Sequence, residues 1–157
     1  QGLMAIRSFR RAGLPALKLA APLLPPAVIG SWVGAALISR LDGDAFQRLF
    51  GFVMIMLLIP TLRGSLPAQK PPTPRKPWSK PLRIVIFFLL GLYGGAIQAG
   101  AGLFVLAALK RSGLDLVVGN SVKVVIIFAL TAAAAPIFLL AGQVDGWAAL
   151  ALFIGFA

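Results

Sequence analysis

The sequence predicts an all-α protein, a polytopic bundle of transmembrane helices. Apolar residues make up 59% of its 157 residues, and the mean hydropathy is +0.94. Charged residues make up 12%, about half of the roughly 25% that is typical of soluble domains. Several apolar runs approach the roughly 20 residues that a helix needs to cross a hydrocarbon core about 30 Å thick. We therefore expect the chain to lie in a lipid bilayer.

The composition excludes several classes of function. The chain has no His and no Cys, so it lacks imidazole and thiolate metal ligands, nucleophilic thiols and disulfides. Its four acidic residues are all Asp, which leaves little for acid/base catalysis. The net charge of +11 would suggest nucleic acid in a soluble protein, but here Lys and Arg lie between apolar runs, where they orient a membrane chain. We expect no enzymatic activity, no metal or cofactor, and no nucleic-acid partner.

The first half of the chain contains two expected spans. Residues 19–38 follow a basic segment and include three prolines, which should kink or delay their helix. Gly30 and Gly34 form a small-xxx-small pair through which another helix could approach closely, although composition alone can produce such a pair among 17 glycines. Residues 46–62 form the second, shorter span.

A basic, proline-rich segment divides the chain. We interpret residues 63–81 as an extended linker, residues 1–62 as the end of a first membrane half, and residues 82–157 as a second half. The charge of the linker places it on the cytoplasmic side. Because the chain opens without Met and residues 147–157 give only half a span, we expect a piece of a longer protein.

A glycine-rich run interrupts the third apolar stretch, residues 82–109. Residues 91–102 contain five glycines and a Gln in the sequence GLYGGAIQAGAG, and each Gly weakens a helix by about 1 kcal/mol relative to Ala. We expect a break here. A single crossing would place Lys110 and Arg111 outside, against the usual charge bias, whereas a re-entrant stretch would return them to the cytoplasmic side. We favour the re-entrant path.

Lys123 is the most informative residue of the fourth span, residues 116–141. A charged side chain inside a span is costly unless it faces a cavity or a partner. Asn120, Lys123 and Thr131 share one helical face with Ile127. The alternative is that the long stem of Lys123 lets its ammonium reach the headgroups.

Together these polar groups suit a small oxyanion better than a metal cation. Interrupted helices in transporters expose backbone N–H groups that attract anions, and glycines leave little bulk beside them. The alternative is that the glycines serve close helix packing and that Asn120 and Ser121 make interhelical hydrogen bonds. The candidate substrate-binding residues are Gln98, Gly100, Gly102, Asn120, Ser121 and Lys123.

Four motifs carry a resemblance over essentially the whole chain. They are residues 91–102, GNSVK at 119–123, AGQVDGW at 141–147 and PAVIGSWVG at 26–34. At these residues the sequence resembles the TauE/SafE sulfite-exporter family of integral membrane proteins. The resemblance implies two homologous halves, each with a glycine-rich motif, joined by a cytoplasmic loop. It also implies export or uptake of sulfite, sulfonates or related anions across the bacterial inner membrane.

One departure from the family pattern leaves the substrate open. Many family members have three glycines followed by a proline, whereas here Gly100-Ala101-Gly102 leads into Leu106 and Ala107 without one. We expect a secondary carrier, because no nucleotide-binding motif is present. The alternative is a non-transporting membrane scaffold or assembly protein, and the sequence does not determine the oligomeric state.

Overall fold

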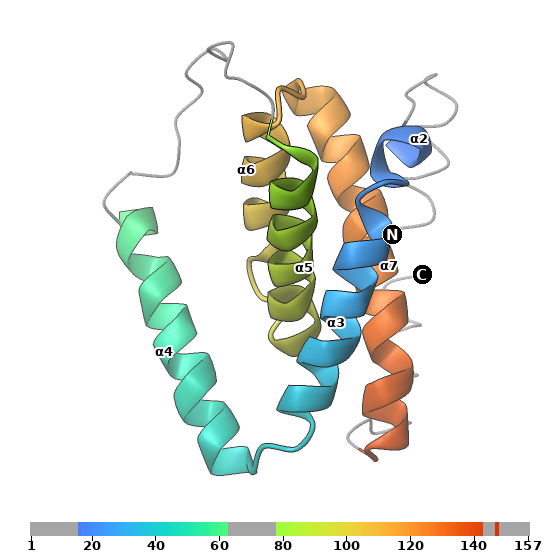
Figure 1. Cartoon of the computed structure of the whole chain (residues 1–157). Coiled ribbons are helices and arrows are strands. Elements are labelled where there is room, and N and C mark those ends of the chain that lie inside the picture. Colours follow the sequence, from blue (N-terminus) through green and yellow to red (C-terminus); the bar gives the residue numbers. More distant parts are fainter. Residues whose placement is uncertain (1–15, 63–77, 143–146, 148–157) are drawn as a thin grey trace.

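The structure, a computed structural model, describes residues 16–62, 78–142 and 147, and its regular elements there are all helices (Figure 1). This confirms the predicted all-α bundle. Most of the predicted linker, residues 63–77, and most of the C-terminal run, residues 148–157, lie outside the described residues. The helices are α2 (Ala16–Ala20), α3 (Leu24–Ile38), α4 (Gly43–Leu62), α5 (Lys80–Ala96), α6 (Ala101–Arg111) and α7 (Leu116–Leu140).

The prolines delay the first predicted span, as expected. Pro22 lies in the turn that separates α2 from α3. Pro25 and Pro26 lie in the first turn of α3, where a missing N–H costs no hydrogen bond. The second and fourth spans coincide with α4 and α7, and α7 is the described helix with the length and hydropathy of a full crossing.

The third apolar stretch breaks where the glycines predict, and the chain then turns back. Residues 97–100 form the α5–α6 turn, and α6 returns beside α5 (Figure 1). Tyr93 fastens this hairpin, because its hydroxyl donates to the carbonyl of Ala99 at 2.6 Å. Its ring also meets Phe104 of α6 edge-on, with centroids 5.4 Å apart. The structure therefore contains the helical hairpin that a re-entrant path requires.

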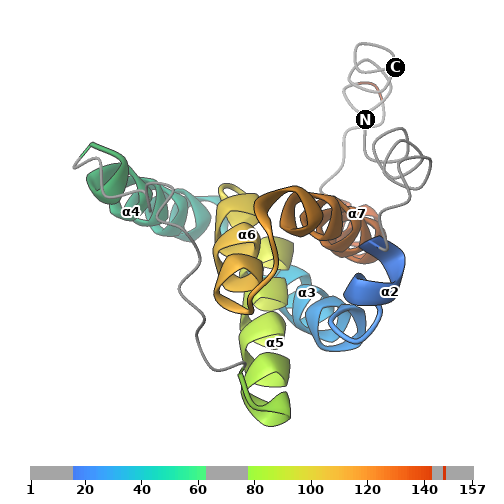
Figure 2. The ribbon, with the colours of Figure 1, turned by 90° about the horizontal axis from the view of Figure 1, so that it is seen from above.

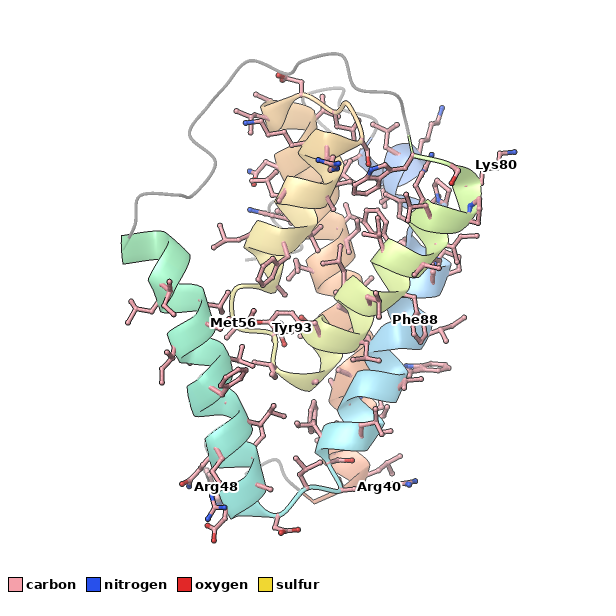
Figure 3. All side chains as sticks on the ribbon, turned by 60° about the vertical axis from the view of Figure 1, so that its left-hand side comes forward. Arg40, Arg48, Met56, Lys80, Phe88 and Tyr93 are labelled. Atoms are coloured by element: carbon pink, nitrogen blue, oxygen red, sulfur yellow. The ribbon has the colours of Figure 1, made fainter. Side chains whose placement is uncertain are left out.

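Basic residues gather at one end of the bundle. The starts of α2, α5 and α7 and the ends of α4 and α6 point to the same end of the bundle, and the α3–α4 turn lies at the opposite end (Figure 1). Figure 3 shows Lys80 at the first end and Arg40 and Arg48 at the other. Among the described residues, the first end has five basic residues and one acidic residue, and the opposite end has two of each. Those at the first end are Lys18, Lys80, Arg83, Lys110, Arg111 and Asp115, and the others are Arg40, Arg48, Asp42 and Asp44.

Glycines bring α3 and α5 into backbone contact. A Cβ at Gly30 would overlap the carbonyl oxygen of Phe88, and one at Gly34 would overlap that of Leu92. The contact is reciprocal, because a Cβ at Gly91 or Gly95 would overlap a backbone carbonyl of α3. The small-xxx-small pair of α3 thus faces a second such pair on α5, and the two helices run parallel (Figure 1).

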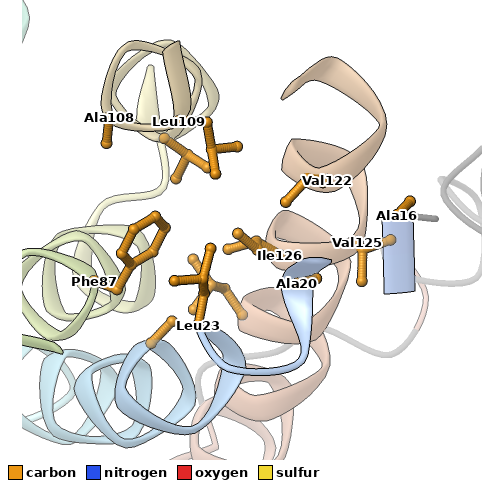
Figure 4. Close-up of a cluster of buried hydrophobic side chains, with 12 residues drawn as sticks. Ala16, Ala20, Leu23, Phe87, Ala108, Leu109, Val122, Val125 and Ile126 are labelled. Atoms are coloured by element: carbon orange, nitrogen blue, oxygen red, sulfur yellow. The ribbon is translucent and has the colours of Figure 1, made fainter. Parts of the chain in front are cut away.

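The buried core forms where α2, α3, α5, α6 and α7 meet (Figure 4). Phe87, Leu109 and Ile126 are among its largest fully buried side chains. By contrast, none of the described side chains of α4 is buried, and the view from above shows α4 to one side of the other helices (Figure 2). Near the α5–α6 turn, however, Leu57 of α4 comes within 3.2 Å of the position a Cβ would take at Gly100.

Candidate functional site

The α5–α6 turn lies level with the second half of α7, where the side chains of Gln98 and Thr131 are exposed. Gln98 donates a hydrogen bond from Nε2 to Oγ1 of Thr131 at 2.7 Å. Thr131 is fifteen residues from the start of α7 and nine from its end, or about 22 Å and 13 Å at 1.5 Å per residue. The turn therefore places polar groups well inside the apolar length of α7.

Two residues in the left-handed region make the break. Gly100 has φ of 72°, and Gln98, at φ 58°, is the one non-glycine residue with positive φ in the part of the chain that the structure describes. A side chain in this conformation is uncommon and costs conformational energy, so it is worth examining for function. The turn ends directly at Ala101, where α6 begins without a side-chain cap.

The uncapped start of α6 offers a backbone donor. The amides of Ala101 and Leu103 donate to the carbonyls of Gln98 and Gly100. The amide of Gly102 has no acceptor among the described residues. Because helix N-termini carry a partial positive charge, such an amide favours an anion.

Lys123 lies beside this helix start. Its Cδ is 3.7 Å from the point where a Cβ would stand at Gly102, so the glycine leaves room for the lysine stem. Lys123 is half-buried and lies seven residues into α7, about 10 Å along the helix. The described acidic residues, Asp42, Asp44 and Asp115, all lie at helix starts. The stem of Lys123 therefore packs beside a residue whose backbone amide has no acceptor in the described part of the chain.

Of the other candidates, Asn120 and Gln98 lie at two different depths along α7, and Ser121 does not join the site. Asn120 is half-buried and precedes Lys123 by one helical turn on the same face. Gln98 lies deeper, beside Thr131, which is eight residues beyond Lys123, or about 12 Å along α7. Ser121 does not join them, because its hydroxyl is fully buried and donates to the carbonyl of Val118 in its own helix at 2.7 Å.

The glycines of the predicted motif serve two separate purposes. Gly91 and Gly95 pack against α3, so the alternative of close helix packing holds for them. Gly100 makes the turn and Gly102 accommodates Lys123. The motif therefore combines a packing surface with a helix break.

Sequence reasoning missed two residues that shape the site. Tyr93 holds the hairpin closed, and the one available signal was that the only Tyr of the chain stands inside the glycine-rich run. Thr131 was placed on the correct face of α7, but its role as the acceptor for Gln98 depends on how deep the turn reaches.

The arrangement suits an anion that accepts hydrogen bonds. It supplies an ammonium, a side-chain amide and a free backbone N–H, all of which can donate. No group of three or more potential metal-binding side chains occurs within the described ranges. Binding of an oxyanion at these residues therefore stays a prediction.

Comparison with known proteins identifies the family to which the chain belongs. Comparisons with curated proteins and with solved structures returned no match. The family model described as "Sulfite exporter TauE/SafE" matches residues 1–157. Because this match covers the whole chain, the chain belongs to the TauE/SafE family of sulfite exporters and is a membrane-located protein of a transport family.

Proposed function

We propose that the protein is a permease that moves a small sulfur-containing anion, such as sulfite or a sulfonate, across the bacterial inner membrane as a secondary carrier. The observation that carries this proposal is the position of Lys123 beside the uncapped start of α6, with the Gly102 amide free. Family membership supports the anion class. Transport does not change the covalent structure of the anion, so the protein needs only to bind the anion on one side and release it on the other.

The chemistry of these anions matches the donors at the site. Sulfite and sulfonate oxygens carry negative charge and accept several hydrogen bonds in different directions. An ammonium has three donors that can rotate toward such oxygens, and a helix-terminal amide adds one donor in a fixed direction. We assign Lys123 and the Gly102 amide to the anion oxygens and place Asn120 at the edge of this site.

Gln98 and Gly100 form the deeper part of the proposed route. Gln98 is bonded to Thr131 in this structure, so its amide must exchange partners to bind an anion that moves past Lys123. Rocking of one membrane half against the other is the usual way in which broken-helix carriers expose such a site in turn to each side. Ser121 is left out of the proposed site because its hydroxyl is bonded within α7.

The distribution of basic residues supports an orientation of the bundle in the membrane. The bundle end that has the basic excess is also the end where α4 finishes and α5 starts (Figure 1). By the positive-inside rule we place this end, and with it the linker of residues 63–81, in the cytoplasm. Residues 1–62 and 82–157 are then parts of two multi-pass membrane halves.

Anion flux in proteoliposomes tests the proposal. We expect Lys123→Met to reduce sulfite flux by about ten- to hundredfold, which corresponds to losing a charge-assisted hydrogen bond. Lys123→Arg keeps the charge and should retain part of the flux. Lys110→Met is the matched control, because it removes the same charge from the last turn of α6, away from the free amide.

Two results would contradict the assignment. Unchanged flux in Lys123→Met would remove Lys123 from the site. An equal loss in Lys110→Met would show that general surface charge, not the site, controls flux. Far-UV circular dichroism and insertion into liposomes must match the unsubstituted protein for each variant.

The second candidate is a non-transporting membrane scaffold. The packing of Gly91 and Gly95 against α3 favours it, because part of the glycine motif then needs no substrate. Sulfite-dependent thermal stabilisation distinguishes the two, since a scaffold has no site whose occupancy would raise the unfolding temperature.

A further inference from the structure

A groove on the outer side of α3 and α5 has no part in the proposed transport site. It has a volume of about 480 Å³ and is lined by apolar side chains from the α2–α3 turn, the first half of α3 and α5. Pro22, Pro25, Pro26, Ile84, Val85 and Phe88 line it. Proline rings give the α3 wall a rigid apolar surface, so the groove is suited to a hydrocarbon chain.

A basic residue precedes the groove residues along α5. Lys80, Ile84 and Phe88 are four residues apart along α5 and therefore form one stripe on its surface. Ile84 and Phe88 lie about 6 Å and 12 Å further along the helix than Lys80. Figure 3 shows Lys80 at the start of α5 and Phe88 below it. This spacing matches a phospholipid, whose charged phosphate lies above its acyl chains.

The start of α5 lies at the level expected for lipid headgroups. Trp78 precedes the helix and packs in part against the buried core, and Trp is enriched at membrane interfaces. Arg83 adds a second positive charge one turn into α5, and the first turns of α3 and α5 contain no acidic residue. A negatively charged headgroup is therefore favoured over a zwitterionic one.

We propose that the groove binds one acyl chain of an anionic phospholipid, with the lipid phosphate held at Lys80. The lipid is a bound partner of the bundle at its basic end and not the transported substrate. The proposal stands independently of transport, because no residue of the groove belongs to the proposed anion site.

Retention of defined lipids tests the proposal. The purified chain is equilibrated with phosphatidylglycerol or phosphatidylcholine of identical acyl chains, and native mass spectrometry counts the lipids that stay bound. We expect about fivefold more retained phosphatidylglycerol, the ratio that one basic residue near an anionic headgroup supports. Lys80→Ala should remove most of this preference, and Arg83 accounts for the remainder.

Groove-filling variants test the acyl-chain part of the proposal. Ile84→Trp places bulk in the groove and should lower retention of both lipids, and Val85→Trp provides a second variant if the first fails to fold. The matched controls are Lys110→Ala, at the end of α6, and Ile55→Trp, on α4 where the side chain is 61% exposed. Both controls should retain lipid like the unsubstituted chain.

Three results would overturn the proposal. They are equal retention of the two lipids by the unsubstituted chain, an equal effect of Lys110→Ala and Lys80→Ala, and full retention after the groove is filled. Glycerol 3-phosphate has the phosphate without acyl chains and should not displace the lipid at millimolar concentration; displacement would be a fourth contradicting result.

Discussion

The backbone contact between α3 and α5 makes a sharp prediction for Gly91→Ala. The added Cβ would meet the carbonyl carbon of Ala27 at 2.7 Å and its Cα at 2.8 Å. Ordinary contacts of a Cβ begin at about 3.4 Å, so α3 must withdraw by at least about 0.7 Å. The obstacle is backbone, and rotation of a side chain cannot relieve it.

The expected cost follows from two opposing effects. Overpacking of a tight contact costs about 1–3 kcal/mol, and replacing Gly by Ala in a helix returns up to about 1 kcal/mol. Withdrawal of α3 also loosens the neighbouring contact of Gly95 with Ser31. We therefore expect Gly91→Ala to lower the free energy of unfolding by about 1–2 kcal/mol.

Gly51→Ala is the matched control for this substitution. Gly51 lies inside α4, and a Cβ there would meet nothing within 4 Å. Only the gain in helix propensity remains, so this variant should be stabilised by up to about 1 kcal/mol. The same chemical change thus has opposite signs in the two helices.

Thermal unfolding in detergent, followed by circular dichroism at 222 nm, measures both variants. Gly91→Ala should unfold several degrees below the unsubstituted chain and Gly51→Ala at or above it. Equal unfolding temperatures for Gly91→Ala and Gly51→Ala would refute the parallel backbone contact described here.

Two further predictions concern the α5–α6 turn. Gly100→Ala forces a side chain to adopt φ of 72° and should lower the free energy of unfolding by about 1–2 kcal/mol. Gly102→Ala should change it little, because its Cβ would meet only Lys123 Cδ at 3.7 Å. Equal unfolding temperatures for the two variants would contradict this expectation. Tyr93→Phe removes the 2.6 Å hydrogen bond to Ala99 and should speed amide hydrogen exchange in the turn by about fivefold, as expected for about 1 kcal/mol; unchanged exchange would show that the ring contact alone holds the hairpin.

Hydropathy and glycine spacing predicted the helices well because lipid imposes a simple rule. Each apolar run had to satisfy its own backbone as a helix, and the glycine run was the weakest place in the third stretch. The positions of α4 and α7 and the break at residues 97–100 follow from this. These features depend on neighbours along the chain, which the sequence contains.

The direction of each polar side chain depended on neighbours that the sequence does not place. Ser121 follows Asn120 directly, but it points about 200° away from Lys123 around α7 and is buried in the core. Likewise, Gly91 and Gly102 both stand in the glycine-rich run, and only the contact with α3 makes Gly91 a packing residue. Tertiary contacts decided both.

The length of α6 links the fold to the proposed function. Its eleven residues extend about 16 Å, roughly half of a hydrocarbon core. With the basic end of the bundle at the headgroups, as proposed above, a helix this short begins within the hydrocarbon core. Its positive N-terminus therefore lies at the depth where a charge is hardest to solvate.

Lys123 adds a second positive group beside that N-terminus. Two like charges repel each other, and within the described ranges the acidic side chains lie at helix starts, away from this pair. Such an arrangement lowers stability unless something negative occupies the space between them. We expect an anion to remove this repulsion and to satisfy both donors, so the proposed transport of an anion accounts for two positive groups at this position.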